Sequence, residues 1–111
     1  MSVEEEIVEF QKMEKQLQEV SLRRVQIESQ LSEINNALKE LENTNEEKVY
    51  KLVGGILVKS SKEDAMQELK SRRDTLERGL HKYSEEEKVL RDKLTRLGKK
   101  LSQFLQQGGG G

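Results

Sequence analysis

Hydrophobic residues recur in the first part of the chain at alternating steps of three and four residues. Nine of the ten positions in this series are apolar, and the exception is Arg24. A seam of this kind over more than four heptads is typical of a coiled coil. It stops at the turn-prone cluster Asn43-Thr44-Asn45, so we predict a helix over residues 1–44. The series comprises Phe10, Met13, Leu17, Val20, Arg24, Ile27, Leu31, Ile34, Leu38 and Leu41.

A second series of the same kind occupies the C-terminal half, where ten of twelve positions are apolar. It begins after Ser60-Ser61-Lys62-Glu63, in which Ser60 and Glu63 fit a capping box. We predict a helix over 61–107, followed by a glycine tail at 108–111 without regular structure. The series comprises Met66, Leu69, Arg73, Leu76, Leu80, Tyr83, Glu87, Leu90, Leu94, Leu97, Leu101 and Phe104.

The short connection between the two seams favours antiparallel pairing of the two helices. In such a pair, an a position of one helix layers against a d position of the other. Registers shifted by one heptad remain open. The pairs that share one register are Leu38 with Leu69, Leu31 with Leu76, Leu17 with Leu90, and Phe10 with Leu97.

The connection contains the segment VYKLVGGILVK at residues 49–59, which is much more apolar than its surroundings. Gly54-Gly55 suits the two-residue turn of a β-hairpin, because both turn residues need positive φ. Alternation then places Tyr50, Leu52 and Leu57 on one face with Lys59. The other face carries Val49, Lys51, Val53, Ile56 and Val58.

Both faces of this hairpin are apolar, and both edges offer unpaired backbone groups. A lone two-stranded hairpin is marginal in water. We therefore predict a mostly α chain, a long antiparallel two-helix coiled coil joined by a short hairpin that assembles with other chains. The expected oligomerisation residues are Val49, Tyr50, Leu52, Val53, Ile56, Leu57 and Val58.

The order of helix, hairpin and helix, with VYKLVGGILVK followed by SSKE, resembles a beta-class prefoldin subunit. The resemblance covers residues 1–107 as a single domain. It implies a cytoplasmic hexamer of two alpha and four beta subunits, whose hairpins join in β-barrels between subunits. It also implies that the ends of the coiled coils hold unfolded polypeptides and deliver them to a group II chaperonin.

Polar residues interrupt both seams. Arg24, Arg73 and Glu87 occupy a positions and are expected to form a buried polar seam, while Glu6 occupies a d position. Such residues cost stability and can fix the register, but long side chains can also extend past the seam into solvent. Because Arg24 and Glu87 fall in adjacent layers, we predict that they meet across the helix pair.

Two glycines, Gly79 and Gly98, lie within the second helix, where each costs about 1 kcal/mol relative to Ala. They either soften the helix or permit close packing.

Apolar residues near both chain ends lie off the seam or at its last layer. Ile7, Val8 and Leu105 are off the seam, and Phe104 is its last d residue. Apolar side chains without an intramolecular partner mark an interaction surface, although ordinary fraying of helix ends also leaves such residues exposed. With the resemblance, the expected client-binding residues are Ile7, Val8, Phe10, Met13, Leu101, Phe104 and Leu105.

Composition narrows the function classes. The formal net charge is −1 and there is no Cys, so we expect no nucleic-acid partner and no thiolate site. His81 is the only histidine and falls at a solvent-facing b position, so we expect no metal, cofactor or catalysis. MSVEEEIVEF is not a signal peptide, and no apolar run suits a membrane span, so we expect a cytosolic protein.

Two functions from different classes agree with these features. The first is a chaperone subunit that holds unfolded chains, and the second is a structural coiled-coil adaptor that tethers defined partners. Suppression of aggregation of several unrelated proteins distinguishes the first from the second.

Overall fold

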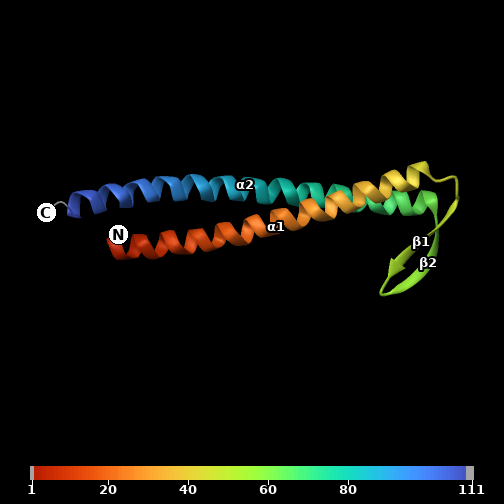
Figure 1. The fold of residues 1–111 in the computed structure, drawn as a ribbon, viewed down its shortest axis with the longest axis horizontal. Helices are drawn as coiled ribbons and strands as arrows, with labels where there is room; N and C mark the ends of the chain where they lie inside the picture. Colours follow the sequence, from red (N-terminus) through yellow and green to blue (C-terminus); the bar gives the residue numbers. More distant parts are fainter. Residues whose placement is uncertain (1, 110–111) are drawn as a thin grey trace. The chain divides into compact units, whose positions relative to one another are not determined.

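The computed structural model describes residues 2–109, which form two long helices with a β-hairpin between them in the chain (Figure 1). The elements are α1 (Val3–Asn43), β1 (Lys48–Val53), β2 (Ile56–Ser61) and α2 (Lys62–Gly109). The helix–hairpin–helix fold predicted from the heptads and from the segment around Gly54-Gly55 is confirmed. The chain divides into two compact units, which we call unit 1 (residues 1–25 and 81–111) and unit 2 (residues 26–80).

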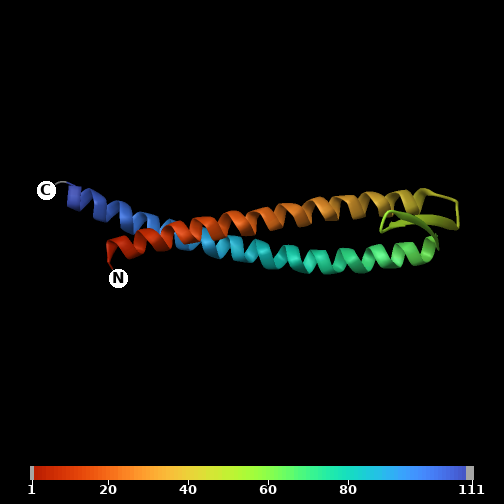
Figure 2. The ribbon, with the colours of Figure 1, turned by 90° about the horizontal axis from the view of Figure 1, so that it is seen from below.

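Unit 1 pairs the start of α1 with the end of α2 in antiparallel fashion (Figures 1 and 2). The Phe10 ring lies against Gly98, where an added Cβ would come 3.5 Å from Cε2 of the ring. Leu101 is buried in the same unit. This is an ordinary van der Waals distance, so the ring packs against Gly98 but a methyl group would also fit there.

Unit 2 contains the remainder of both helices together with the hairpin. Its helices bury Leu31, Ile34, Leu38 and Ala65. Ile27 Cδ1 lies 3.4 Å from where a Cβ on Gly79 would stand, so a seam residue packs against this second glycine as well.

The contacts within each unit agree with the predicted register. In unit 1, Phe10 meets Gly98, one residue from its predicted partner Leu97. In unit 2, Ile27 meets Gly79, one residue from Leu80, which the same register places opposite Ile27. Both contacts belong to the unshifted register rather than to one displaced by a heptad.

The hairpin has the register that alternation predicted. Gly54 and Gly55 form the turn with φ values of 55° and 80°, a left-handed conformation that glycine adopts at little cost. The cross-strand pairs are Lys48 with Ser61, Val49 with Ser60, Tyr50 with Lys59, Lys51 with Val58, Leu52 with Leu57, and Val53 with Ile56.

The start of α2 differs from the sequence prediction by one residue. Ser61, not Ser60, caps the helix, because its Oγ accepts a hydrogen bond of 3.0 Å from the Asp64 backbone amide. Ser60 instead lies in β2 opposite Val49. The predicted Ser60–Glu63 capping box was therefore wrong, since strand pairing reaches further along the chain than the apolar run suggested.

The end of α2 also differs from the prediction. Gly108 and Gly109 continue the helix, whereas an unstructured tail was expected from residue 108. A glycine in a helix costs about 1 kcal/mol relative to Ala, which is too little to prevent a long helix from continuing for two more residues. The rest of the predicted tail, residues 110–111, lies outside the described residues.

Candidate functional site: two exposed apolar surfaces

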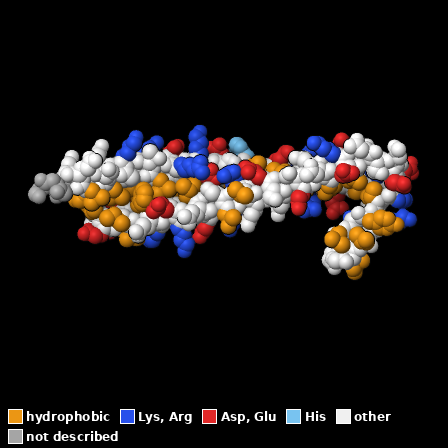
Figure 3. Space-filling model, viewed as in Figure 1, with side chains coloured by type: hydrophobic (Ala, Val, Ile, Leu, Met, Phe, Trp, Pro, Cys, Tyr) orange, Lys and Arg blue, Asp and Glu red, His pale blue; other side chains and the backbone are white. Residues whose placement is uncertain are grey.

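The first candidate surface is the hairpin, where six large hydrophobic side chains are exposed. Exposure reaches 71% at Leu52, and among the predicted oligomerisation residues only Val49 is half-buried. Figure 3 shows hydrophobic side chains gathered over this part of the chain. The exposed residues, which we call the hairpin surface, are Tyr50, Leu52, Val53, Ile56, Leu57 and Val58.

One face of the hairpin is directed toward the helices of unit 2. Lys51 Nζ lies 3.1 Å from Glu68 Oε2 on α2, and a hollow of about 440 Å³ separates this face from α1 and α2. On the opposite face, Tyr50, Leu52 and Leu57 are exposed, although Tyr50 and Leu52 also border this hollow. Unit 2 thus presents an apolar sheet surface that its own helices do not complete.

The backbone hydrogen bonding of the hairpin is also incomplete. The sheet of the described residues contains only β1 and β2, so each strand pairs along one edge and leaves its other edge without a partner strand. Free edges are templates for further strands. This surface therefore combines apolar side chains with directional backbone hydrogen-bonding groups.

The second candidate surface lies in unit 1, near both chain ends. Ile7 and Val8 on α1 and Phe104 and Leu105 on α2 are exposed, with exposed fractions from 37% at Ile7 to 61% at Leu105. We call these four residues the terminal patch. They are helical side chains, so their backbone groups are bonded within the helices and only the side chains are available to a partner.

The other three predicted client-binding residues are less accessible. Phe10 and Met13 are half-buried, and Leu101 is only 8% exposed. Leu101 stabilises the helix pair of unit 1, so it reaches a partner only if that pair opens. The accessible part of the predicted set is the terminal patch.

Glu6, the polar residue at a d position of the first seam, has a partner of its own. The residue is 9% exposed, and its Oε1 accepts a hydrogen bond of 2.6 Å from Lys100 Nζ. The lysine side chain reaches across from the opposite helix, so the carboxylate at this d position is paired. Sequence reasoning missed Lys100, which occupies no seam position.

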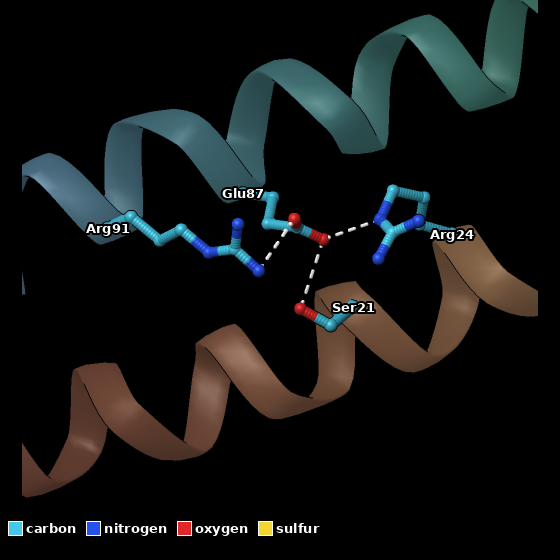
Figure 4. Close-up of polar contacts among 4 residues, drawn as sticks. All are labelled: Ser21, Arg24, Glu87 and Arg91. Carbon is cyan, nitrogen blue, oxygen red and sulfur yellow. Dashed lines mark hydrogen bonds and ion pairs between the residues drawn. The ribbon is translucent and has the colours of Figure 1, made fainter.

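A polar cluster holds the two helices together elsewhere in unit 1 (Figure 4). Glu87 Oε2 accepts hydrogen bonds from Arg24 Nε at 2.7 Å and from Ser21 Oγ at 3.0 Å. Its Oε1 lies 2.9 Å from a terminal guanidinium nitrogen (NH2) of Arg91, one turn further along α2. The predicted meeting of Arg24 and Glu87 is confirmed, and we call Ser21, Arg24, Glu87 and Arg91 the Glu87 cluster.

The cluster keeps Glu87 ionised. The hydrogen bond from Arg24 lowers the pKa of Glu87 most, and Ser21 and Arg91 lower it further, while burial acts in the opposite direction. A buried carboxylate with this many donors is satisfied only when α1 and α2 are in register. The cluster therefore favours the observed pairing over a shifted one.

The predicted buried polar seam needs correction. Glu87 is buried, but the side chains of Arg24 and Arg73 are 26% and 33% exposed. Arg73 lies 3.9 Å from Asp74 and 4.0 Å from Glu77, both on its own helix. The long arginine side chains extend past the seam, so their charged ends remain near water.

Ser21 and Arg91 were missed because the heptad pattern ranks only the a and d positions. The spacing of Glu87 and Arg91, four residues apart on one helix face, was the available signal for the second ion pair.

Among residues 2–109 no group of His, Cys, Asp and Glu side chains is arranged to hold a metal ion. His81 is exposed. Neither of the two helices, over the residues that the structure describes, is both long and apolar enough to cross a membrane.

Antiparallel helices joined by a β-hairpin with an exposed apolar surface define a helix–hairpin–helix protein. A family model described as a prefoldin subunit matches residues 4–108. The chain therefore belongs to the prefoldin subunit family, and its curated relatives place it in the beta class.

The relatives are similar over nearly their whole length. "Prefoldin subunit beta" of Saccharolobus islandicus is 36% identical, with 96% of this chain and 89% of that protein covered. The protein of the same name from Caldivirga maquilingensis is 34% identical, over 99% and 92%. The crystal structure of the prefoldin beta subunit from Thermococcus strain KS-1 matches with a TM-score of 0.83 at 33% identity, covering 93% of this chain and 91% of that chain.

Membership of this family indicates the general function of the chain. Prefoldin subunits are chaperone components rather than enzymes, and they assemble with other prefoldin subunits.

Proposed function

We propose that this chain is a subunit of a holdase, a chaperone that binds unfolded polypeptides without nucleotide. In this proposal the hairpin surface assembles with alpha-class and other beta-class prefoldin subunits into a cytoplasmic hexamer. The terminal patch holds the client, which then passes to a group II chaperonin. One observation carries the proposal: the chain exposes two separate apolar surfaces, one built from strands and one from helices.

The hairpin surface suits assembly because its partner must satisfy both side chains and strand edges. A neighbouring hairpin does both by adding strands, and a β-barrel formed between subunits removes the free edges altogether.

The terminal patch suits client holding for the opposite reason. Its helices satisfy their own backbone groups, so it offers only apolar area and sets no strand register. Each large side chain contributes about 1–3 kcal/mol when fully buried by a client. Several chains in one assembly raise the local concentration of such patches, so weak contacts combine into useful avidity.

The test is aggregation suppression by the complete assembly, measured with several unrelated denatured proteins. We expect suppression of all of them without ATP. Suppression of a single protein, with no effect on the others, would contradict the holdase and favour an adaptor for a defined partner.

The subunit composition of the assembly and the delivery of the client are tested by separate measurements. Native mass spectrometry of this chain, alone and with alpha-class subunits, is expected to give a mixed hexamer with two alpha subunits. Transfer of a labelled denatured client from that hexamer to a group II chaperonin tests the delivery step, and retention of the client by the hexamer would contradict it.

A further inference from the structure

A groove with an apolar floor runs between α1 and α2 in unit 1, apart from the terminal patch. It consists of two adjoining hollows of about 470 and 580 Å³, and both are lined by Gln16 and Leu90. Figure 3 shows hydrophobic side chains along this part of the chain with charged side chains beside them. We call it the lateral groove, and its floor consists of Met13, Val20, Val89, Leu90 and Leu97.

One end of the lateral groove is acidic. Glu19 on α1 and Glu85 and Glu86 on α2 line it beside Val20 and Val89. Val89 is 49% exposed, so apolar area is accessible among these carboxylates.

Arg23 offsets part of the negative charge at this end. Its pKa is raised, first by a hydrogen bond with Tyr83 and also by the nearby carboxylates of Glu19 and Glu86. Three carboxylates against one guanidinium leave the acidic end negative.

The other end has a different charge arrangement. Lys93, Arg96 and Lys100 line it from α2, and Glu6 and Glu9 line it from α1. Lys100 is paired with Glu6, whereas Lys93 and Arg96 form no ion pair within 4 Å among residues 2–109. The α2 wall at this end is therefore basic.

We propose that the lateral groove binds an amphipathic helical segment of another polypeptide, with basic residues at the acidic end and acidic residues beside Lys93 and Arg96. A valley between two helices accepts the side-chain ridge of a third helix. From Glu6 to Val20 the groove follows α1 for roughly 21 Å, which matches a helix of about 14 residues. This inference goes beyond client holding. The terminal patch does not require the charges of its partner in a particular order along the chain, whereas the lateral groove does.

The direct test uses two fluorescent synthetic peptides of identical composition and about 15 residues. Both carry leucines at helical spacing on one face. In the first, the bipolar peptide, the lysines lie at one end and the glutamates at the other, and in the second the two charges alternate. Fluorescence anisotropy with the full-length chain in its assembled form is expected to show about threefold to tenfold tighter binding of the bipolar peptide, because several exposed ion pairs add small increments.

Variants locate the binding. Glu85→Gln with Glu86→Gln is expected to weaken binding of the bipolar peptide about threefold, and the loss disappears at high salt. Glu14→Gln with Asp92→Asn makes the same charge change at exposed positions outside the lateral groove and is expected to have no effect. Val89→Gln is expected to weaken binding about tenfold through the lost apolar contact, whereas Leu22→Gln, at an exposed residue outside the lateral groove, leaves it unchanged.

Three results would overturn the proposal. The first is that the assembly binds neither peptide, or binds both equally. The second is that groove and control variants bind alike while circular dichroism shows all of them folded. The third is that the groove variants change the size of the assembly without peptide, which would mean that another subunit occupies the lateral groove.

Discussion

The hairpin surface and the terminal patch are both apolar and exposed, yet they differ in what a partner must supply. Leu52 of the hairpin is 71% exposed beside strand edges that have no partner strand in the described chain. Leu105 of the terminal patch is 61% exposed, but it stands on a helix that bonds its own backbone. A partner of the hairpin must match a strand register, whereas a partner of the patch need only bring apolar area. In the proposed function, this difference lets one short chain serve both a defined assembly and variable clients.

Each of these regions also has its own polar contacts. The Glu87 cluster and the Glu6–Lys100 pair join the helices of unit 1. In unit 2, Ser61 caps α2, and the Lys62 amide donates to the Glu47 carbonyl at 2.8 Å. Substitutions within one unit can therefore remove the contacts of that region and leave those of the other region in place.

The largest expected effect comes from charges in the hairpin. Leu52→Asp with Val58→Asp places one carboxylate on each face, so at least one is buried on assembly without a partner. We expect sedimentation to show loss of the oligomer, while circular dichroism retains the helical signal. Gln26→Glu with Gln67→Glu adds the same charge at exposed helical positions of unit 2 and should assemble normally. An oligomer of parental size from the hairpin variant would show that the hairpin is not the assembly element.

A smaller effect is expected from the Glu87 cluster. Glu87→Gln removes the ionised acceptor of the Arg24 and Ser21 hydrogen bonds, which should lower the free energy of unfolding by about 2 kcal/mol. Glu77→Gln, at the exposed pair with Arg73, should cost about 0.5 kcal/mol or less. Urea unfolding of Glu87→Gln, Arg24→Gln and the double variant measures the coupling. Zero coupling energy would mean that the contact between Arg24 and Glu87 does not stabilise the fold. Loss of assembly in these variants would contradict the independence of the two regions.

Low pH should reduce the contribution of Glu87 to the free energy of unfolding. Its pKa is lower in the folded chain than the ordinary value of 4.5, so the contribution is complete above 4.5 and is lost as the pH falls through the lowered pKa. The difference in unfolding free energy between the parent and Glu87→Gln should therefore shrink as the pH falls from 7 to about 3. A difference that stays constant or grows on acidification would contradict the assigned protonation.

The smallest effect concerns the junction of the hairpin and α2. Ser61→Ala should lower the free energy of unfolding by about 1 kcal/mol, because the Asp64 amide loses its acceptor. Ser60→Ala should cost less, since the Ser60 hydroxyl only donates to the neighbouring Ser61 carbonyl. Thermal unfolding of both variants decides which serine is the cap, and a larger loss for Ser60→Ala would reverse the assignment.

Heptads and turn chemistry predicted most of the fold from the sequence. Helix limits fell within a few residues, and Gly54-Gly55 set the strand register because a two-residue turn leaves only one alternation of side chains. The Arg24–Glu87 contact followed from the same heptad count. These features depend on periodicity, which a sequence displays directly.

Features that depend on the reach of long side chains were not predictable in the same way. Lys100 pairs with Glu6 of the opposite helix from a position outside the seam, so the heptad count did not indicate this contact. The lateral groove also needed the structure, because its floor combines Val20 of α1 with Val89 of α2, and Val89 lies off the heptad series. A pattern in one helix does not show which side chains the other helix brings beside it.

The central claim is that assembly and client holding use different surfaces. Phe104→Gln with Leu105→Gln alters the terminal patch, and Leu22→Gln with Val25→Gln alters the same number of apolar residues with comparable exposure elsewhere in unit 1. Native mass spectrometry and aggregation suppression of a denatured protein are measured on the same samples at equal assembly concentration. We predict parental size for both variants, with clearly weaker suppression only for the patch variant. Equal suppression by both variants, or loss of assembly in the patch variant alone, would contradict the account.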